Sequence, residues 1–365
     1  MIVGVNCPTV ALAGGYSQGG GHGPFSTKFG LAVDQVLEWK VVTGIGALVT
    51  ATPTQNSDLF WTLSGGGGGT YSVVLSATVK FHPKVSSISS ATLQFASPTT
   101  EGVAEYWHST KIFLQSLPLM VHSGLQIVWN IGPGFFLISP VTGLDVKQDT
   151  IDSLFPPTLS ALKQAEIPHV YASAVSTSFL KYYNSAGFGA NVSNANTAGR
   201  LLSCSVVQNS TDSFVSVLQT IVKNGYLMAG VTLDVNKTVV LGAPETSVNP
   251  YAAIDLSILQ WRKTIINAVY GTYLNYMDFS ANFRSQNFMT ETIGPTLAAL
   301  TPNGAAYLNE GDCQQPNWQE VFYGANYKLL NSIKAKYDPL DRFYALGAVG
   351  SDRWTENIDG HLCKV

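Results

Sequence analysis

The feature that most constrains this chain is a glycine-rich segment close to its N-terminus. Residues 7–23 read CPTVALAGGYSQGGGHG, with six glycines among the ten residues 14–23. Glycine leaves backbone N–H groups unshielded, and a run of such groups forms a nest that suits a pyrophosphate or a flat ring. The segment contains neither the Gly-Lys-Ser/Thr of a Walker A loop nor a G-x-G-x-x-G fingerprint. It therefore indicates either a loop that binds an anionic cofactor or a purely structural loop.

The composition excludes several classes of protein. With 45% hydrophobic and 12% charged residues, the 365-residue chain can bury a large core in two or three domains, which excludes wholesale disorder. Twenty basic and 23 acidic residues give a net charge of −3, so no nucleic-acid partner is expected. No run of about 18 apolar residues predicts a membrane span, and the four cysteines include no Cys-x-x-Cys pair that would predict zinc. We therefore expect no bound metal.

Signals for the cellular compartment point in two directions. Three glycosylation acceptors, at Asn191, Asn209 and Asn236, favour a secreted glycoprotein. The N-terminus, Met1-Ile-Val-Gly-Val, has no positively charged region or cleavage site of a signal peptide. The protein is therefore either cytoplasmic or lacks its original N-terminus in this sequence.

Apolar patterns predict helices that alternate with strands, which is typical of an α+β protein with an antiparallel sheet. β-Branched and alternating residues predict strands over 33–43, 47–51, 71–81, 126–139 and 225–241. Helical spacing and capping residues predict helices over 59–63, 99–117 and 211–222, a long helix within 249–273, and one over 318–336 that ends before Asp338-Pro339.

Two separate sets of motifs carry a resemblance to a known family. CPTVALAGGYSQGGGHG is followed by KFGLAVDQV and then by DLFWTLSGGGGGTY. Near the other end, YLNE, NWQ, FYGANY, YDP and FY follow one another between residues 307 and 344. Both sets, in this order, resemble the berberine-bridge-enzyme-like flavoprotein oxidases of the vanillyl-alcohol-oxidase superfamily, whose FAD-binding domain is of the PCMH type. Residues between about 84 and 300 resemble that family only in placement and character.

The resemblance implies a split α+β architecture. Residues 1–83 would form the second half of the PCMH-type FAD-binding domain, 84–305 a substrate domain with a large antiparallel sheet, and 306–365 a segment that returns to the FAD domain. Family members begin with a further half-domain, whose histidine makes a second covalent bond to the flavin. None of the six histidines here lies in such a motif. We therefore expect an N-terminally truncated chain: an incomplete fragment, an inactive natural truncation, or one half of a site completed by another chain.

The same resemblance assigns residues to the cofactor. Cys7 matches a cysteine that can form a thioether to the flavin ring, and the alternative is a structural thiol. Tyr307 and Asn309 match a Tyr-x-Asn pair that lines the flavin, and the alternative is a plain edge strand. His22 could act as a ligand or base, or could only fill a hydrogen-bonding position in a glycine turn. The expected cofactor-binding residues are Cys7, Thr9, Gly14, Gly15, Tyr16, Gly19, Gly20, Gly21, His22, Val74, Tyr307 and Asn309.

The implied reaction is the oxidation of a small organic substrate by hydride transfer to N5 of FAD, with O2 as the acceptor that reoxidises the flavin. Carbohydrates, alkaloids and other products of secondary metabolism remain open as substrates. No catalytic base is assigned, because Asp255 in the stretch 252–259 could equally be a solvated surface charge. The rival interpretation is an inactive remnant that needs the N-terminal half as a partner before it can bind FAD. The full-length family member is expected to be secreted.

Overall fold

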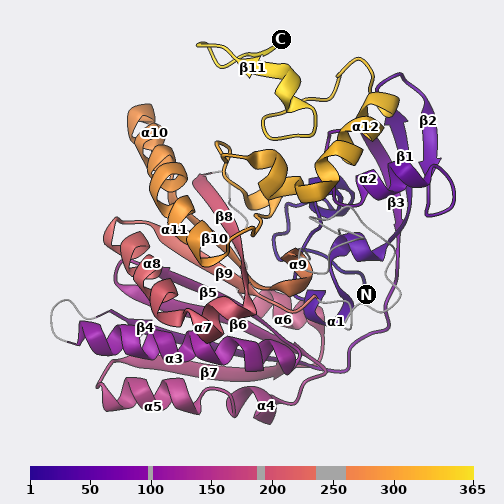
Figure 1. Cartoon of the computed structure of the whole chain (residues 1–365). Helices are drawn as coiled ribbons and strands as arrows, with labels where there is room; N and C mark the ends of the chain where they lie inside the picture. Colours follow the sequence, from indigo (N-terminus) through magenta and orange to yellow (C-terminus); the bar gives the residue numbers. More distant parts are fainter. Residues whose placement is uncertain (98–101, 187–193, 236–259) are drawn as a thin grey trace.

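The computed structural model describes residues 1–97, 102–186, 194–235 and 260–365. Its largest element is a sheet built from β4 (Ile88–Ala96), β5 (Leu125–Gly132), β6 (Phe135–Leu144), β7 (His169–Ser176), β8 (Ala195–Ser203), β9 (Leu227–Thr232) and β10 (Thr264–Tyr273). The seven strands lie in the order β7-β4-β6-β5-β9-β10-β8, and every neighbouring pair is antiparallel (Figure 1). The α+β class and the large antiparallel sheet are confirmed.

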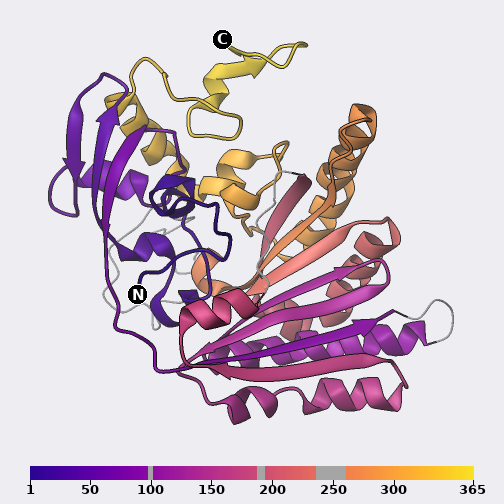
Figure 2. The same cartoon turned by 180° about the vertical axis from the view of Figure 1, so that it is seen from behind.

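Helices pack on one face of this sheet and bury its core (Figures 1 and 2). The helix predicted over 211–222 is α8 (Thr211–Lys223), on which Phe214, Leu218 and Ile221 recur at helical spacing and are completely buried. Beneath Phe214 lies the ring of Trp129, and a Cβ on Gly230 would lie 2.1 Å from that ring. The other helices of this part are α3 (Val103–His122), α4 (Gln148–Asp152), α5 (Pro156–Gln164), α6 (Phe179–Ser185), α7 (Cys204–Asn209), α9 (Gln260–Lys263), α10 (Phe279–Phe288), η3 (Met289–Ile293) and α11 (Gly294–Leu300).

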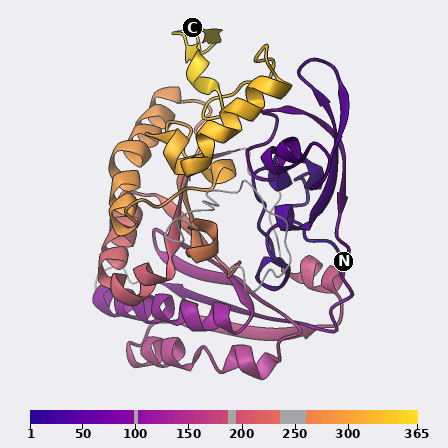
Figure 3. The ribbon, with the colours of Figure 1, turned by 45° about the vertical axis from the view of Figure 1, so that its right-hand side comes forward.

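A second, three-stranded sheet is formed by β1 (Val36–Thr43), β2 (Leu48–Ala51) and β3 (Ser72–Val79), in the order β2-β1-β3. Its core also contains residues from α2 (Ser57–Leu63) and α12 (Tyr327–Tyr337), so the two ends of the chain share one hydrophobic cluster. Figure 3 shows the yellow C-terminal helix beside the indigo N-terminal elements. The remaining elements are η1 (Leu12–Tyr16), α1 (Ser26–Phe29), η2 (Ala32–Gln35), η4 (Leu308–Glu310), η5 (Gln319–Tyr323), η6 (Gly324–Asn326), η7 (Ser351–Arg353), β11 (Trp354–Glu356) and β12 (Leu362–Lys364).

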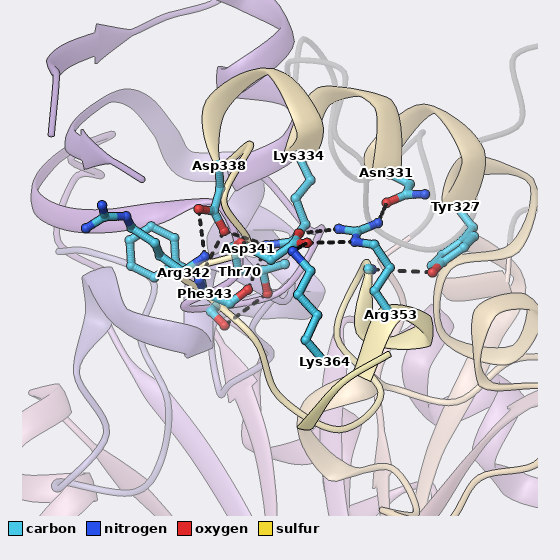
Figure 4. A network of polar contacts seen from close by, with 12 residues as sticks. Thr70, Tyr327, Asn331, Lys334, Asp338, Asp341, Arg342, Phe343, Arg353 and Lys364 are labelled. Carbon is cyan, nitrogen blue, oxygen red and sulfur yellow. Dashed lines mark hydrogen bonds and ion pairs between the residues drawn. The ribbon is translucent and has the colours of Figure 1, made fainter. Parts of the chain in front are cut away.

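A buried ion pair anchors the C-terminal segment to the small sheet (Figure 4). Lys334 Nζ donates to Asp338 Oδ2 at 2.9 Å and to the carbonyl oxygen of Thr70 at 2.8 Å. Asp338 also accepts from the backbone N–H groups of Arg342 and Phe343. The residues that end α12 therefore connect it to the loop that leads into β3.

One predicted helix is wrong. Residues 264–273, placed in a long helix by the sequence, form β10, and only the short α9 precedes them. The segment TIINAVYGTY is rich in β-branched and aromatic residues, and pairing with β8 and β9 satisfies its backbone on both sides. The remainder of that prediction, 249–259, lies outside the described residues.

Two other predicted elements are divided in the structure. The strand predicted over 126–139 is a hairpin of β5 and β6 that turns at Gly134, whose φ is +86°. The helix predicted over 318–336 consists of η5, η6 and α12, because Gly324 has a φ of +55° and interrupts it. That helix ends at Tyr337, before Asp338-Pro339, as predicted.

Within the described ranges, no helix is both long enough and apolar enough to cross a bilayer. Over the same parts of the chain, no three His, Cys, Asp or Glu side chains come together as a set of metal ligands.

Candidate functional site

A cavity of about 620 Å³ lies between the N-terminal residues and strands β8, β9 and β10. Side chains alternate between the two faces of a strand, and those of Ala229, Val231 and Val269 lie on the face that lines the cavity. Their neighbours Met228 and Ala268 belong to the core under the helices. The lining includes six residues predicted from the sequence, namely Cys7, Gly15, Tyr16, His22, Tyr307 and Asn309, and also Glu310, Val5, Val10, Ala195 and Thr197.

The two glycine-rich segments pack directly against each other. A Cβ on Gly68, in the run of five glycines, would lie 2.5 Å from the Cα of Gly15. Gly67 N–H donates to the carbonyl oxygen of Gln18 at 3.1 Å. Gly21 has a φ of +76°, a left-handed conformation that other residues rarely adopt. Both segments are therefore glycine-rich because their backbones approach closely and turn sharply.

Tyr307 and Asn309 hold this glycine loop in place from the C-terminal segment. Asn309 Nδ2 donates to the carbonyl oxygen of Gly15 at 3.0 Å, and Gly21 N–H donates to Tyr307 Oη at 3.1 Å. A Cβ on Gly19 would lie 2.5 Å from the Asn309 side chain, so glycine is needed there as well. Tyr307 precedes the single turn η4 and Asn309 lies within it, so the alternative of a plain edge strand is excluded.

Two buried phenols line the cavity, and burial keeps both in the neutral form. Tyr16 Oη donates to the carbonyl oxygen of His22 at 3.1 Å. Tyr307 Oη accepts from Asn309 Nδ2 at 2.6 Å as well as from Gly21, and its own proton has no acceptor within the described residues. Burial, then the neighbouring Tyr307 and Glu310, raise the pKa of Tyr16 well above its usual value. Burial, then Glu310, raise the pKa of Tyr307 in the same way.

Cys7 brings a nucleophile to the cavity. Its Sγ lies 3.1 Å from Thr9 Oγ1, and the side chain is only partly buried, unlike a purely structural thiol. Hydrogen bonds from the Thr9 side chain and then from its backbone lower the pKa of the Cys7 thiol, which favours the reactive thiolate. Thr9 itself is exposed and contacts Cys7 without lining the cavity.

A hydrogen-bonded trio completes the polar part of the cavity. His22 Nε2 lies 3.1 Å from Glu310 Oε1, and Asn267 Nδ2 donates to Glu310 Oε2 at 2.5 Å. Burial raises the pKa of Glu310, but the electrostatic interaction and hydrogen bond with His22 and the hydrogen bond from Asn267 outweigh that effect, so this pKa is lowered. Glu310 is therefore a carboxylate at neutral pH.

Two members of this trio were missed by the sequence analysis. Glu310 lies in the YLNE motif without an assigned role, and Asn267 lies in the segment wrongly predicted as helical. An alternating pattern over β10 would have placed Asn267 and Val269 on one face. No local pattern connects Asn267 to either partner.

The other predicted residues lie outside the cavity lining. Gly14, Gly19, Gly20 and Gly21 belong to the loop that Tyr307 and Asn309 hold, behind the lining residues. Val74 lies on β3 and packs against the core of the small sheet, so the structure does not bring it to the cavity. Asp255 lies outside the described residues.

Comparisons with known proteins find similarity to flavoproteins. Residues 306–349 match the family model described as "Berberine and berberine like". The chain is 39% identical to the FAD-linked oxidoreductase sor8 of Hypocrea jecorina, over 98% of this chain and 60% of that protein. It is 37% identical to the FAD-linked oxidoreductase patO of Aspergillus clavatus, over 100% of this chain and 62% of that protein. The crystal structure of the VAO-type flavoprotein MtVAO615 of Myceliophthora thermophila superposes with a TM-score of 0.86 at 32% identity, over 100% of this chain and 65% of that one.

Over nearly its whole length, the chain resembles the berberine-bridge-like flavoproteins of the vanillyl-alcohol-oxidase superfamily. This berberine-bridge-like chain spans about 60% of the length of the curated relatives it matches. A glucooligosaccharide oxidase of Acremonium strictum, at 20% identity and a TM-score of 0.69, shares the fold.

The residues of the berberine-bridge-like chain fit a flavin. Gly15 lines the cavity, and a Cβ placed on it would meet nothing within 4 Å, so its backbone is open to the face of a ligand. Tyr307 retains a hydroxyl proton for a ring nitrogen or oxygen. Cys7 brings a thiol whose pKa is lowered to the same cavity. An open backbone, a neutral hydroxyl donor and a nucleophilic sulfur together suit a flat ring with polar edges.

Proposed function

We propose that this chain is an FAD-dependent oxidoreductase that acts at the cavity between the glycine loop and β8–β10. The observation that carries the proposal is the convergence of Cys7, Gly15, Tyr307 and Asn309 on that one cavity from opposite ends of the chain. Relatives named FAD-linked oxidoreductases support it. FAD, when bound, supplies a two-electron acceptor for the hydride of the substrate, and O2 is the acceptor we expect afterwards.

The chain's own residues would hold the cofactor in distinct ways. Cys7 would bind the flavin ring covalently through a thioether, with Thr9 favouring its thiolate form. Tyr307 would donate its hydroxyl proton to the ring, and the backbone of Gly15 would lie against it. Gly19 and Asn309 would keep the loop in the shape that allows this approach.

The walls of the cavity favour an apolar alcohol as substrate. Its sheet side presents Ala195, Ala229, Val231 and Val269, and Val5 and Val10 face it from the N-terminal segment. A carbohydrate would leave several hydroxyl groups without hydrogen-bond partners against such walls, which is unfavourable. A small primary alcohol with an aryl or alkenyl group would bury its apolar part and offer one hydroxyl to the polar residues. We therefore propose a role in secondary metabolism.

The glycosylation acceptors support secretion as part of the proposal. Asn209 is exposed at the end of α7 and is accessible to a glycan. Asn191 and Asn236 lie outside the described residues. A mass shift on treatment with an N-glycosidase, after expression in a eukaryotic secretory host, would test this point.

The test of the main proposal is an absorbance spectrum of the purified chain incubated with FAD, before and after acid precipitation. We expect a flavin spectrum that stays with the pellet of the parent and moves to the supernatant in Cys7→Ser. Cys363→Ser is the matched control, because Cys363 is an exposed thiol far from the cavity lining, and it should behave as the parent. A parent that remains colourless would instead support the inactive remnant that needs an N-terminal half as a partner.

A further inference from the structure

The polar end of the cavity is organised around the imidazole of His22. Its side chain is 10% exposed and lines the cavity. The ring is packed at 6.0 Å from the ring of Trp261 and at 5.5 Å, edge to face, from that of Tyr307. Packing on two sides holds the imidazole in one orientation. That constraint is unnecessary for a residue that only fills a turn.

Glu310 determines which nitrogen of His22 carries the proton. Nε2 of His22 lies 3.1 Å from Glu310 Oε1 and 3.3 Å from Asn267 Nδ2. A carboxylate only accepts hydrogen bonds, and the contact to it is the shorter and the charge-assisted one, so we assign the proton of the neutral ring to Nε2. The second nitrogen, Nδ1, is then an acceptor, and it has no hydrogen-bond partner within the described residues. An imidazole that donates to a carboxylate through one nitrogen and accepts through the other has the arrangement of a general base.

Asn267 holds the carboxylate in place. It is completely buried on β10, and its Nδ2 donates to Glu310 Oε2 at 2.5 Å. Its Oδ1 is buried and has no partner in the part of the chain that the structure describes. Both oxygens of Glu310 are thus engaged by donors, which makes the carboxylate itself a poor base and His22 the better one.

We propose that His22 is the general base that removes the hydroxyl proton of the substrate, and that Glu310 and Asn267 are the residues that position it. This inference rests on the proposed function. In the step, Nδ1 of His22 takes the proton of the alcohol as the carbon–hydrogen bond breaks and a carbon–oxygen double bond forms. The hydride, with its two electrons, leaves to the FAD, so the alcohol is oxidised and the cofactor is reduced. Glu310 balances the positive charge that forms on His22.

The experiment compares three variants of the full chain with the parent: His22→Ala, Glu310→Gln and, as a control, His82→Gln. His82 is also a histidine with a hydrogen-bonded ring, to Gln35 at 2.8 Å, but it does not line the cavity. Flavin content is measured first, from the absorbance spectrum. Turnover of benzyl and cinnamyl alcohol is then measured with and without added imidazole.

We expect His22→Ala to keep the flavin content of the parent and to lose about 10²–10⁴-fold in kcat, with KM little changed. Added imidazole should restore part of that kcat in His22→Ala and none in Glu310→Gln, and His82→Gln should match the parent. A flavin-loaded His22→Ala that keeps its kcat, or that imidazole fails to rescue, would overturn the proposal. A parent that takes up no flavin would overturn the proposed function itself, and this result is visible before any turnover is measured.

A second readout needs no cofactor. Nitrogen-15 NMR of histidine-labelled chain, with the His22 signal assigned by its loss in His22→Ala, reports which ring nitrogen carries the proton. We expect Nε2 protonation in the parent and a mixture of tautomers in Glu310→Gln, because the carboxylate that selects Nε2 is gone. Protonation at Nδ1 in the parent, or no change in Glu310→Gln, would refute the positioning role.

Discussion

Replacing Lys334 by methionine is expected to destabilise this chain much more than the same substitution two residues later in α12. The Lys334 side chain is 1% exposed, and its Nζ donates to Asp338 and to the carbonyl oxygens of Thr70 and Phe343 (Figure 4). Methionine fills nearly the same volume but donates no hydrogen bond. Asp338, which is completely buried, would then keep a charge without its partner.

The expected magnitude comes from the burial of the pair. Removing one partner of a buried ion pair costs about 3–5 kcal/mol of unfolding free energy. Burial lowers the pKa of Lys334, and its hydrogen bond to Asp338 does not fully offset that effect, so both charges are costly to hold without each other. Lys336 pairs with Asp58 at 2.6 Å, but its side chain is 60% exposed, and surface pairs contribute about 0–1 kcal/mol. We therefore expect a difference of about 3 kcal/mol between the two variants.

The assay is urea unfolding followed by tryptophan fluorescence for Lys334→Met, Lys336→Met and the double variant Lys334→Met/Asp338→Asn. The double variant removes the unpaired charge and should recover part of the lost stability, even if the single variant is too unstable to purify. The reasoning would be refuted if Lys334→Met were as stable as Lys336→Met. It would also be refuted if the double variant were the least stable of the three.

Acid should weaken the C-terminal segment further, because the hydrogen bond from Arg353, above all, lowers the pKa of Asp341 from 3.8 to about 2. Because the pKa of Asp341 is lowered in the folded state, its ionised form stabilises the fold by about 2 kcal/mol. This stabilisation is complete above the ordinary pKa and is lost as the pH falls toward 2. Urea titrations at several pH values should show the loss in the parent and not in Asp341→Asn. Gly68→Ala should cost about 1–3 kcal/mol and reduce flavin uptake, because the new Cβ would lie 2.5 Å from a backbone atom of the first glycine loop. Gly4→Ala, whose Cβ would meet nothing within 4 Å, is the control, and equal melting temperatures for the two variants would contradict the close approach.

Local pattern was enough for much of the fold. The helix predicted over 211–222 is α8, and it buries the apolar stripe of Phe214, Leu218 and Ile221, as a helix with one apolar face must. The same reasoning failed over 264–273, where a run of buried residues reads equally well as helix or strand. Pairing with β8 and β9 makes this segment a strand. Both partner strands lie elsewhere in the sequence, so no local pattern reveals the pairing.

The sequence by itself determined the glycine loop, the C-terminal Tyr307 and Asn309, and the family to which they point, because these signals are contiguous in the chain. Only the tertiary structure brought His22 to Glu310, 288 residues away, and set Asn267 against both. Such hydrogen bonds leave no periodic trace in a sequence. They depend on the register of β10 and on the path of the backbone around η4, and long-range packing decides both.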